Sequence, residues 1–187
     1  MLATKPNHAV YFGPPGSGKS TLLACDYAAC PLPAYIVDPQ GEHCARPGDV
    51  IERNPLDPSQ CAADMARAAY DRGNCQLVID ESDLCWFGQE PPFEVIFVAR
   101  RGRHRNVLMR LATQRPVAIP RNISASACEI SIFSTTDSRD MEYFAKLGLS
   151  PEKMRLTAPY MYWHYRRDLP RWHTHHAPLT LCDVRTG

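Results

Sequence analysis

Short apolar runs alternate with longer segments of mixed polarity along this chain of 187 residues. The apolar runs favour buried strands, because four to eight apolar residues bounded by turn residues fit a sheet covered on both faces. The mixed segments have helical composition and end at glycine, proline or asparagine. The pattern predicts strands at 8–12, 34–38, 50–51, 76–81, 107–114 and 129–133, and helices at 18–29, 61–72, 93–101 and 138–147.

This alternation predicts the fold class α/β, with a mainly parallel sheet and helices on both faces. The length fits a single domain over 1–187, and we expect its core at about 8–148. The remaining extension, 149–187, is rich in aromatic residues around 160–165. That extension predicts an added strand or hairpin.

The composition places the chain among folded globular proteins, since 44% of its residues are hydrophobic and 22% are charged. No run approaches the roughly 18 apolar residues of a membrane span, and the N-terminus lacks the apolar core of a signal peptide. The eight cysteines contain no Cys-x-x-Cys pair. The spacing therefore favours reduced thiols over a zinc site.

Charge is divided unevenly between the two halves of the chain. Residues 1–99 carry six Lys/Arg and thirteen Asp/Glu, a net charge of −7, whereas residues 100–187 carry fifteen and seven, a net charge of +8. Within 100–121 there are seven arginines and no acidic residue. Such a cluster fits a polyanion or an approaching phosphate, but a solvated arginine face has the same composition.

The most specific motif is Gly-Pro-Pro-Gly-Ser-Gly-Lys-Ser at 13–20, between a predicted strand and a predicted helix. It matches the P-loop (Walker A) pattern, in which backbone N–H groups surround phosphates at a helix N-terminus. Lys19 is expected to reach the β- and γ-phosphates of ATP, and the Ser20 hydroxyl to ligate Mg²⁺. The expected nucleotide-binding residues are Gly13, Pro14, Pro15, Gly16, Ser17, Gly18, Lys19, Ser20 and Thr21.

Polar residues follow two later strands at the sheet edge where a P-loop would lie. Asp80 and Glu81 close one of these strands. We expect Asp80 to hold Mg²⁺, directly or through water, and Glu81 to polarise the attacking water. Gln114 ends the next strand and would contact the γ-phosphate and that water, with Thr113 as the alternate candidate. A solvated carboxylate and a locally bonded amide are the alternatives without a catalytic role.

The order of these motifs, with Arg-His-Arg-Asn-Val-Leu-Met-Arg-Leu-Ala-Thr-Gln-Arg-Pro at 103–116, resembles the FtsK–HerA superfamily of DNA-pumping ATPases. The resemblance covers roughly 8–148. It implies a RecA-like P-loop NTPase core of the ASCE type, with an extra strand between the Walker A and Walker B strands. It also implies Gln114 as the sensor, and an arginine supplied to the neighbouring subunit's nucleotide, for which Arg103, Arg101 and Arg100 are the candidates.

The resemblance further implies an ATP-driven translocase of double-stranded DNA that acts as a ring, usually a hexamer. Because the chain is short, we expect a compact genome-packaging ATPase of a tailless virus, in the host cytoplasm or associated with the virion, with a capsid or portal-vertex protein as partner. A Zot-type phage assembly or secretion ATPase and another plasmid or phage DNA-transfer ATPase are the alternatives. A kinase or nucleotide switch is disfavoured by Asp80, Glu81 and Gln114 together.

Two loops are candidates to face a central pore. One spans 82–92 and holds Trp86 and Phe87, which would also fit a buried aromatic anchor. The other lies near 116–122, with Arg115 and Arg121. Either loop would make phosphate contacts that are independent of base sequence.

The C-terminal extension offers histidines and aromatic residues. His173, His175 and Cys182 suggest a metal, but no second complete ligand set is visible, so a polar surface tail or a subunit contact is favoured. The aromatic residues are expected to pack the sheet edge or an interface rather than bind a base: Tyr160, Tyr162, Trp163 and Tyr165.

Overall fold

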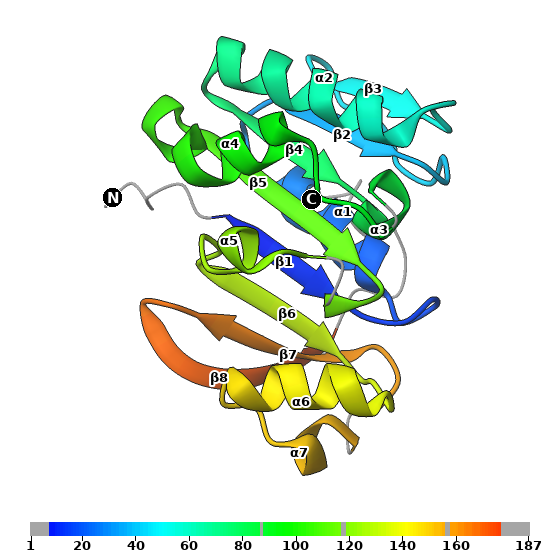
Figure 1. Cartoon of the computed structure of the whole chain (residues 1–187), viewed down its shortest axis with the longest axis vertical. Coiled ribbons are helices and arrows are strands. Elements are labelled where there is room, and N and C mark those ends of the chain that lie inside the picture. Colours follow the sequence, from blue (N-terminus) through cyan, green and yellow to red (C-terminus); the bar gives the residue numbers. More distant parts are fainter. Residues whose placement is uncertain (1–7, 87, 117–118, 156–157, 177–187) are drawn as a thin grey trace.

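The computed structural model describes residues 8–86, 88–116, 119–155 and 158–176. Their strands form one eight-stranded sheet in the order β3-β2-β4-β5-β1-β6-β7-β8 (Figure 1). The strands are β1 (Ala9–Phe12), β2 (Ala34–Asp38), β3 (Val50–Arg53), β4 (Cys75–Ile79), β5 (Val107–Thr113), β6 (Glu129–Phe133), β7 (Met161–Arg166) and β8 (Leu169–His176). Neighbours among β1 to β6 pair parallel, whereas β7 and β8 pair antiparallel.

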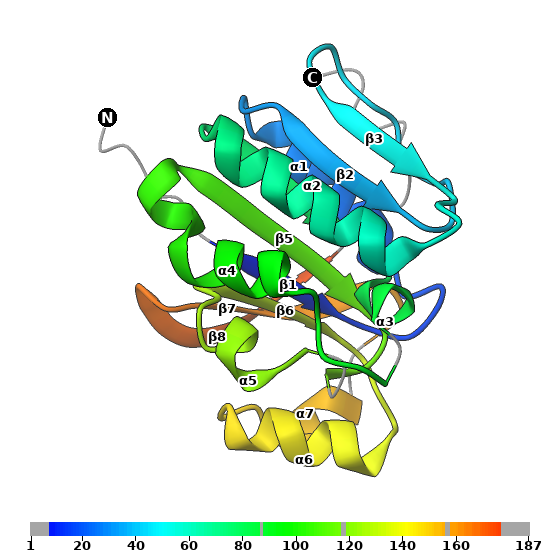
Figure 2. The same ribbon diagram turned by 45° about the horizontal axis from the view of Figure 1, so that its top comes forward.

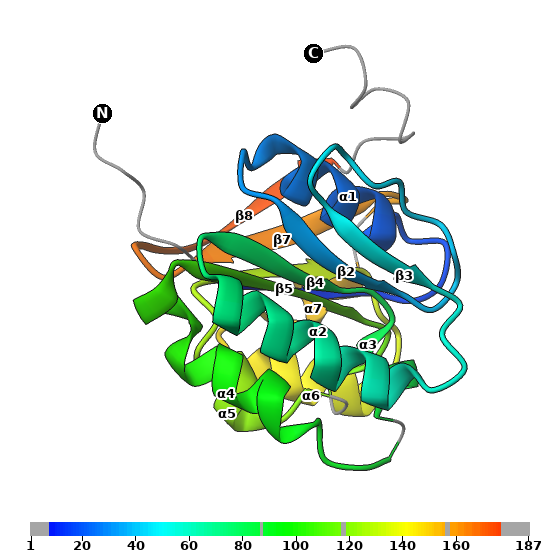
Figure 3. The ribbon, with the colours of Figure 1, turned by 90° about the horizontal axis from the view of Figure 1, so that it is seen from above.

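Helices cover both faces of this sheet, as the alternating pattern predicted. Figures 2 and 3 show α1 on one face and α2, α4, α5 and α6 on the other. The helices are α1 (Lys19–Ala29), α2 (Pro58–Arg72), α3 (Ser82–Cys85), α4 (Phe93–Arg101), α5 (Arg121–Ser124), α6 (Ser138–Lys146) and α7 (Pro151–Arg155), with a 3-10 turn, η1, at Gly102–Arg105.

Strand β1 shows why the central strands are apolar along their whole length. Val10 and Phe12 belong to the core beneath α2, α4 and α6, and the Phe12 ring lies 5.4 Å from that of Phe144. The alternate residues Ala9 and Tyr11 belong to the core beneath α1. Because successive side chains of a strand point to opposite faces, a strand between two helix layers must be apolar at every position.

The predicted elements are present, and their ends differ by a few residues at most. The second helix begins at Pro58 rather than at residue 61, because the Asp57 carboxylate accepts a hydrogen bond from the Gln60 backbone N–H at 2.9 Å. Proline at the first helical position suits that start. Strand β5 lies between β1 and β4, so the extra strand implied by the family resemblance is confirmed.

Of the two placements open to Trp86, a pore-facing loop and a buried aromatic anchor, the structure shows the buried anchor. Segment 82–92 is not all loop, since α3 forms there, and Trp86 is only 3% exposed within the core beneath α2 and α4. Burying so large an aromatic ring contributes more to folding than exposure on a loop would allow. Phe87 lies outside the described residues.

The C-terminal extension forms a hairpin that enlarges the sheet. Strand β7 pairs with β6 in an antiparallel register that sets Ile132 opposite Trp163, and β8 pairs with β7. The Tyr162 ring lies 5.3 Å from that of Phe133, so the hairpin is joined to the core by side chains as well as by backbone. Over the described residues, no helix is long and apolar enough to cross a membrane.

Candidate functional site

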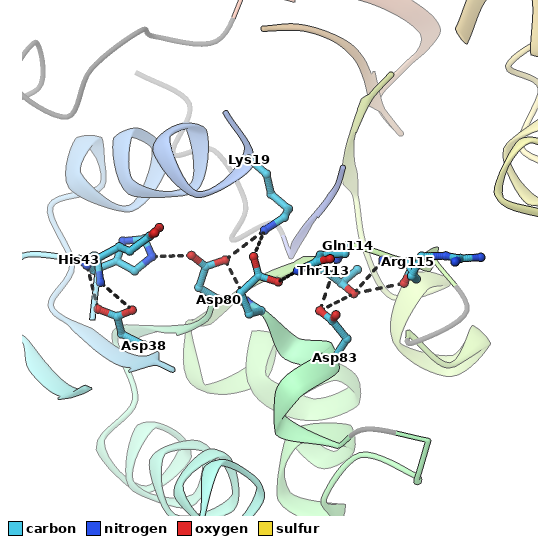
Figure 4. A network of polar contacts seen from close by, with 10 residues as sticks. Lys19, Asp38, His43, Asp80, Asp83, Thr113, Gln114 and Arg115 are labelled. Atoms are coloured by element: carbon cyan, nitrogen blue, oxygen red, sulfur yellow. Dashed lines mark hydrogen bonds and ion pairs between the residues drawn. The ribbon is translucent and has the colours of Figure 1, made fainter. Parts of the chain in front are cut away.

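The carboxyl ends of three adjacent strands bring the predicted site residues together. Segment 13–20 follows β1, Asp80 and Glu81 follow β4, and Gln114 follows β5. Because β5 lies between β1 and β4, its end stands beside both of the other loops (Figure 4). In open parallel sheets this edge is where ligands bind.

The 13–20 loop has the backbone of a phosphate-binding loop. Gly18 caps α1 in the left-handed conformation, φ 95°, and the first turn of α1 has no side-chain cap and no acidic residue. The first N–H groups of that helix therefore remain available to an anion. Gly13 packs so closely on β6 that a β-carbon there would lie 2.8 Å from the Phe133 β-carbon. A pocket of about 420 Å³ opens between this loop, Glu81 and Gln114.

The Glu81 carboxylate is held from two sides. Lys19 Nζ lies 2.7 Å from Glu81 Oε1, and Gln114 Nε2 donates to Glu81 Oε2 at 3.0 Å (Figure 4). Lys19 is 3% exposed and also lies 3.6 Å from Asp80. The Glu81 carboxylate, at the end of β4, thus links the P-loop after β1 with Gln114 at the end of β5.

The backbone of Glu81 is unusual for a residue with a side chain. Its φ of 45° lies in the left-handed region, which costs about 1–3 kcal/mol for a non-glycine residue. Its own N–H donates to Asp80 Oδ1 at 2.9 Å and its carbonyl accepts from Leu84 N at 2.8 Å. These bonds and the two side-chain contacts hold the strained conformation and aim the carboxylate at the P-loop.

Asp80 is a buried carboxylate that stays ionised. Burial alone would raise its pKa, but the hydrogen bond from His43 and the charge of Lys19 outweigh burial and lower the pKa to about 2. The Ser20 hydroxyl also lowers the pKa of this carboxylate. A hydroxyl and an ionised carboxylate side by side are the oxygen ligands that Mg²⁺ accepts, with waters and phosphates completing its shell. The Ser20 hydroxyl and the Asp80 carboxylate therefore fit a Mg²⁺ site.

His43 is a site residue that the sequence analysis missed. Its Nε2 donates to Asp80 Oδ2 at 2.8 Å, and its backbone N–H donates to an Asp38 carboxylate oxygen at 2.8 Å. Arg53 holds the His43 carbonyl through two N–H groups, at 3.0 and 3.2 Å. The only signal was position, because 39–43 follows β2, whose carboxyl end lies next to that of β4.

The three candidate trans arginines are not near the nucleotide pocket of their own chain. Arg100, Arg101 and Arg103 are exposed and lie before the amino end of β5, the edge opposite the P-loop. Arg103 Nη1 lies 3.7 Å from the Cys128 sulfur, just ahead of β6. A role for any of them at a nucleotide would require a second copy of the chain.

Other members of the arginine cluster have structural partners. Arg105 donates to two backbone carbonyls at the end of α2, and Arg110 donates to polar side chains of β1 and β4. Arg115, offered by the sequence as a pore residue, pairs with Asp137 and Asp140 at 3.1 Å each. The cluster is therefore not one uniform basic surface. Arg121 is exposed at the start of α5.

The C-terminal histidines form part of the hairpin surface. The His175 ring stacks on that of Tyr162 at 5.6 Å. Across the described segments, no group of three or more His, Cys, Asp or Glu residues could hold a metal ion, and no cysteine forms a disulfide. Cys182 lies outside the described residues.

The fold is shared with known ATPases. The chain superposes on the genome-packaging NTPase B204 of Sulfolobus turreted icosahedral virus 2, in complex with AMPPCP, with a TM-score of 0.76 and 17% identity over 95% of this chain and 100% of that chain. The pCW3 conjugation coupling protein TcpA, with ATPγS, gives a TM-score of 0.72 and 13% identity over 99% of this chain and 66% of that chain. The N-terminal domain of zonular occludens toxin from Neisseria meningitidis gives a TM-score of 0.57 and 13% identity over 96% of this chain and 98% of that chain.

No protein-family model matches this sequence, and neither does any curated protein. The chain nonetheless has the three-layer α/β fold of P-loop NTPases. The resemblance to FtsK–HerA-type ATPases, which the motifs indicated, is confirmed at the level of the fold.

The contact between His43 and Asp80 predicts a measurable titration. Burial lowers the pKa of His43, but the hydrogen bond and charge of Asp80 raise it above its ordinary 6.5. We expect the pair to stabilise the fold fully between pH 3.8 and pH 6.5, the ordinary pKa values of the two groups. That effect is lost as pH rises through the folded pKa of His43 or falls through that of Asp80, about 2. In Asp80→Asn the largest group that raises the pKa of His43 is removed, so this pKa should fall from its wild-type value.

NMR titration of the imidazole ring, without divalent metal, measures this change. His164 on β7 serves as the control, because Asp80 is not among the groups that shift its pKa. An unchanged His43 midpoint in Asp80→Asn would contradict the assignment.

Proposed function

We propose that this chain is an ATP-driven translocase of double-stranded DNA that packages a viral genome, working as a single ATPase domain in a homo-oligomeric ring of six subunits. The observation that carries the proposal is the Glu81 carboxylate, held between Lys19 of the P-loop and Gln114 of the next strand. B204, a genome-packaging NTPase, supports the packaging role because it matches this chain over its full length.

In this proposal the pocket beside 13–20 binds the triphosphate of ATP. The N–H groups at the start of α1 and the Lys19 ammonium neutralise its charge. Ser20 and Asp80 hold Mg²⁺, which when bound stabilises negative charge on the phosphate oxygens. Glu81 accepts the proton of the attacking water, and the Gln114 amide orients that water.

The contact between Lys19 and Glu81 gives a reason for hydrolysis to await nucleotide. The Glu81 carboxylate is engaged by the Lys19 ammonium at 2.7 Å. Phosphates compete with Glu81 for Lys19, and the carboxylate is then free to accept a proton. Because Gln114 is hydrogen-bonded to Glu81, it would move when Glu81 is released from Lys19. That movement would shift the segment between β5 and α5.

A ring explains the placement of the exposed arginines. Arg100, Arg101 and Arg103 lie opposite their own P-loop, so a neighbouring subunit's γ-phosphate is the anion one of them would reach. An arginine in that position stabilises charge that develops during phosphoryl transfer. Exposed arginines such as Arg121 would bind the DNA backbone without reading sequence. We place such a motor in the host cytoplasm or on the virion, with a capsid or portal-vertex protein as partner.

Two substitutions separate nucleotide binding from hydrolysis. Lys19→Ala should abolish ATP turnover, because the principal cation at the triphosphate is lost. Glu81→Gln keeps the shape of the side chain but removes the base, and we expect it to bind ATP with a turnover at least about 100-fold lower. Phosphate release and equilibrium ATP binding measure the two effects. Full turnover by Glu81→Gln would remove this carboxylate from the mechanism.

DNA stimulation tests the work that hydrolysis drives. We expect duplex DNA to raise the ATPase rate at low salt, and the stimulation to fall steeply as salt rises, because phosphate contacts release counterions. Single-stranded DNA of equal length is the control. If duplex DNA neither binds nor stimulates at low salt, the assembly or secretion role of a Zot-type ATPase is favoured instead, which the similarity to the zonular occludens toxin domain supports.

Mixed rings test the arginine in trans. Arg103→Ala should lose activity alone and regain part of it when mixed with Glu81→Gln, because some interfaces then combine an intact Glu81 with an intact Arg103. Arg100→Ala and Arg101→Ala are examined in the same way, and Arg139→Ala, an exposed residue of α6, is the control. Loss of activity without rescue for every mixture would argue against an arginine in trans.

A further inference from the structure

The turn that leads into β7 holds an aromatic residue in a backbone conformation that favours glycine. Met161 N donates to Ala158 O at 3.0 Å, which closes a four-residue turn with Pro159 second and Tyr160 third. Tyr160 has a φ of 60°. Turns with proline at the second position and positive φ at the third normally carry glycine or asparagine there, and a bulky residue at positive φ is rare. Strain of this kind clusters at ligand sites.

The Tyr160 side chain lies at the P-loop. It is 44% exposed and lines the phosphate pocket together with the 13–20 loop. It also lines a second pocket, of about 370 Å³, which shares Pro14, Pro15 and Gly16 with the first. The two pockets are therefore continuous along the loop, with Tyr160 where they meet.

The second pocket lies on the side away from the catalytic groups. Glu81 and Gln114 follow β4 and β5, on one side of β1. Phe133 ends β6, on the other side, and Ser134 follows it. A nucleotide with its γ-phosphate beside Glu81 must extend in the opposite direction along the P-loop. Its nucleoside then reaches the second pocket.

The walls of the second pocket suit an uncharged, flat group. None of its described lining residues is charged, and Pro159, Tyr160 and Met161 contribute apolar surface. The Ser134 hydroxyl is already used, because it donates to the Met154 carbonyl at 3.2 Å. A third phosphate group or a metal ion would find no opposite charge there, whereas an aromatic ring would find a face to stack on.

We propose that Tyr160 stacks on the nucleobase of the bound nucleotide, so that the C-terminal hairpin completes the nucleotide site. This role differs from the packing of a sheet edge or an interface that the sequence led us to expect for Tyr160, and it rests on the proposed binding of ATP at the P-loop. Stacking uses the face of the base, which every nucleobase has. Tyr160 therefore contributes affinity for the nucleoside and none for the phosphates.

Three variants, compared with the wild type, and two probes test the proposal. Tyr160→Asn removes the ring but tolerates the left-handed backbone, Tyr160→Phe keeps the ring, and Phe93→Asn removes a 72% exposed ring from α4 as the control. Affinities for ATP and for inorganic tripolyphosphate are measured by calorimetry with Mg²⁺. We expect Tyr160→Asn to bind ATP about tenfold more weakly and tripolyphosphate within about twofold of the wild type. Tyr160→Phe and Phe93→Asn should match the wild type for both probes.

Unchanged ATP affinity in Tyr160→Asn would overturn the proposal. Equal losses for ATP and tripolyphosphate would overturn it too, because the substitution would then act through the P-loop. The midpoint of thermal unfolding shows whether the variant folds normally. We expect the midpoint of Tyr160→Asn to be no lower than that of the wild type, because asparagine relieves backbone strain. If the wild type binds neither probe, the proposed P-loop function itself fails, an outcome distinct from a failure at Tyr160.

Discussion

The site depends on one electrostatic constraint, which is that two carboxylates and one ammonium are buried together at the end of β4. Asp80, Glu81 and Lys19 are 3%, 6% and 3% exposed. Removing such charges from water is costly unless they are paired and hydrogen-bonded. Here every carboxylate has partners: His43 and Lys19 for Asp80, and Lys19 and Gln114 for Glu81. The same pairing that stabilises the buried charges keeps the proposed catalytic groups in contact.

Two residues at the edge of this site have a strained backbone. Glu81 and Tyr160 are both non-glycine residues at positive φ, and both border the phosphate pocket. At Glu81 the surrounding bonds hold the conformation and aim the carboxylate at Lys19. At Tyr160 the turn places a ring at the junction of two pockets. In the proposed nucleotide site, each residue would give up local stability for a position at the ligand.

The direction of the parallel strands places two sets of charged groups at opposite edges of the sheet. The carboxyl edge carries the P-loop, Asp80, Glu81 and Gln114, while the amino edge of β5 carries the exposed arginines. In the proposed ring, the arginines of one subunit would meet the nucleotide of the next, so that both edges would take part in one site.

The sequence predicted the features that depend on neighbouring residues. The motif 13–20 specified the phosphate-binding loop, because its glycines and its helix start are local properties. Apolar runs specified the strands and the helices between them. The α/β class and the order of the site motifs followed from these, since parallel strands bring their carboxyl ends to one edge.

Only the tertiary structure decided contacts between segments far apart in the chain. His43 reaches Asp80 over 37 residues, and Tyr160 reaches the P-loop over more than 100. Local patterns hold no signal for such pairs, because the strand order and the path of the hairpin determine which loops meet. Trp86 was ambiguous for the same reason, since an aromatic residue in a polar segment can face solvent or the core until packing determines its place. Sequence thus determined the chemistry available at this site, and packing determined which groups can act together.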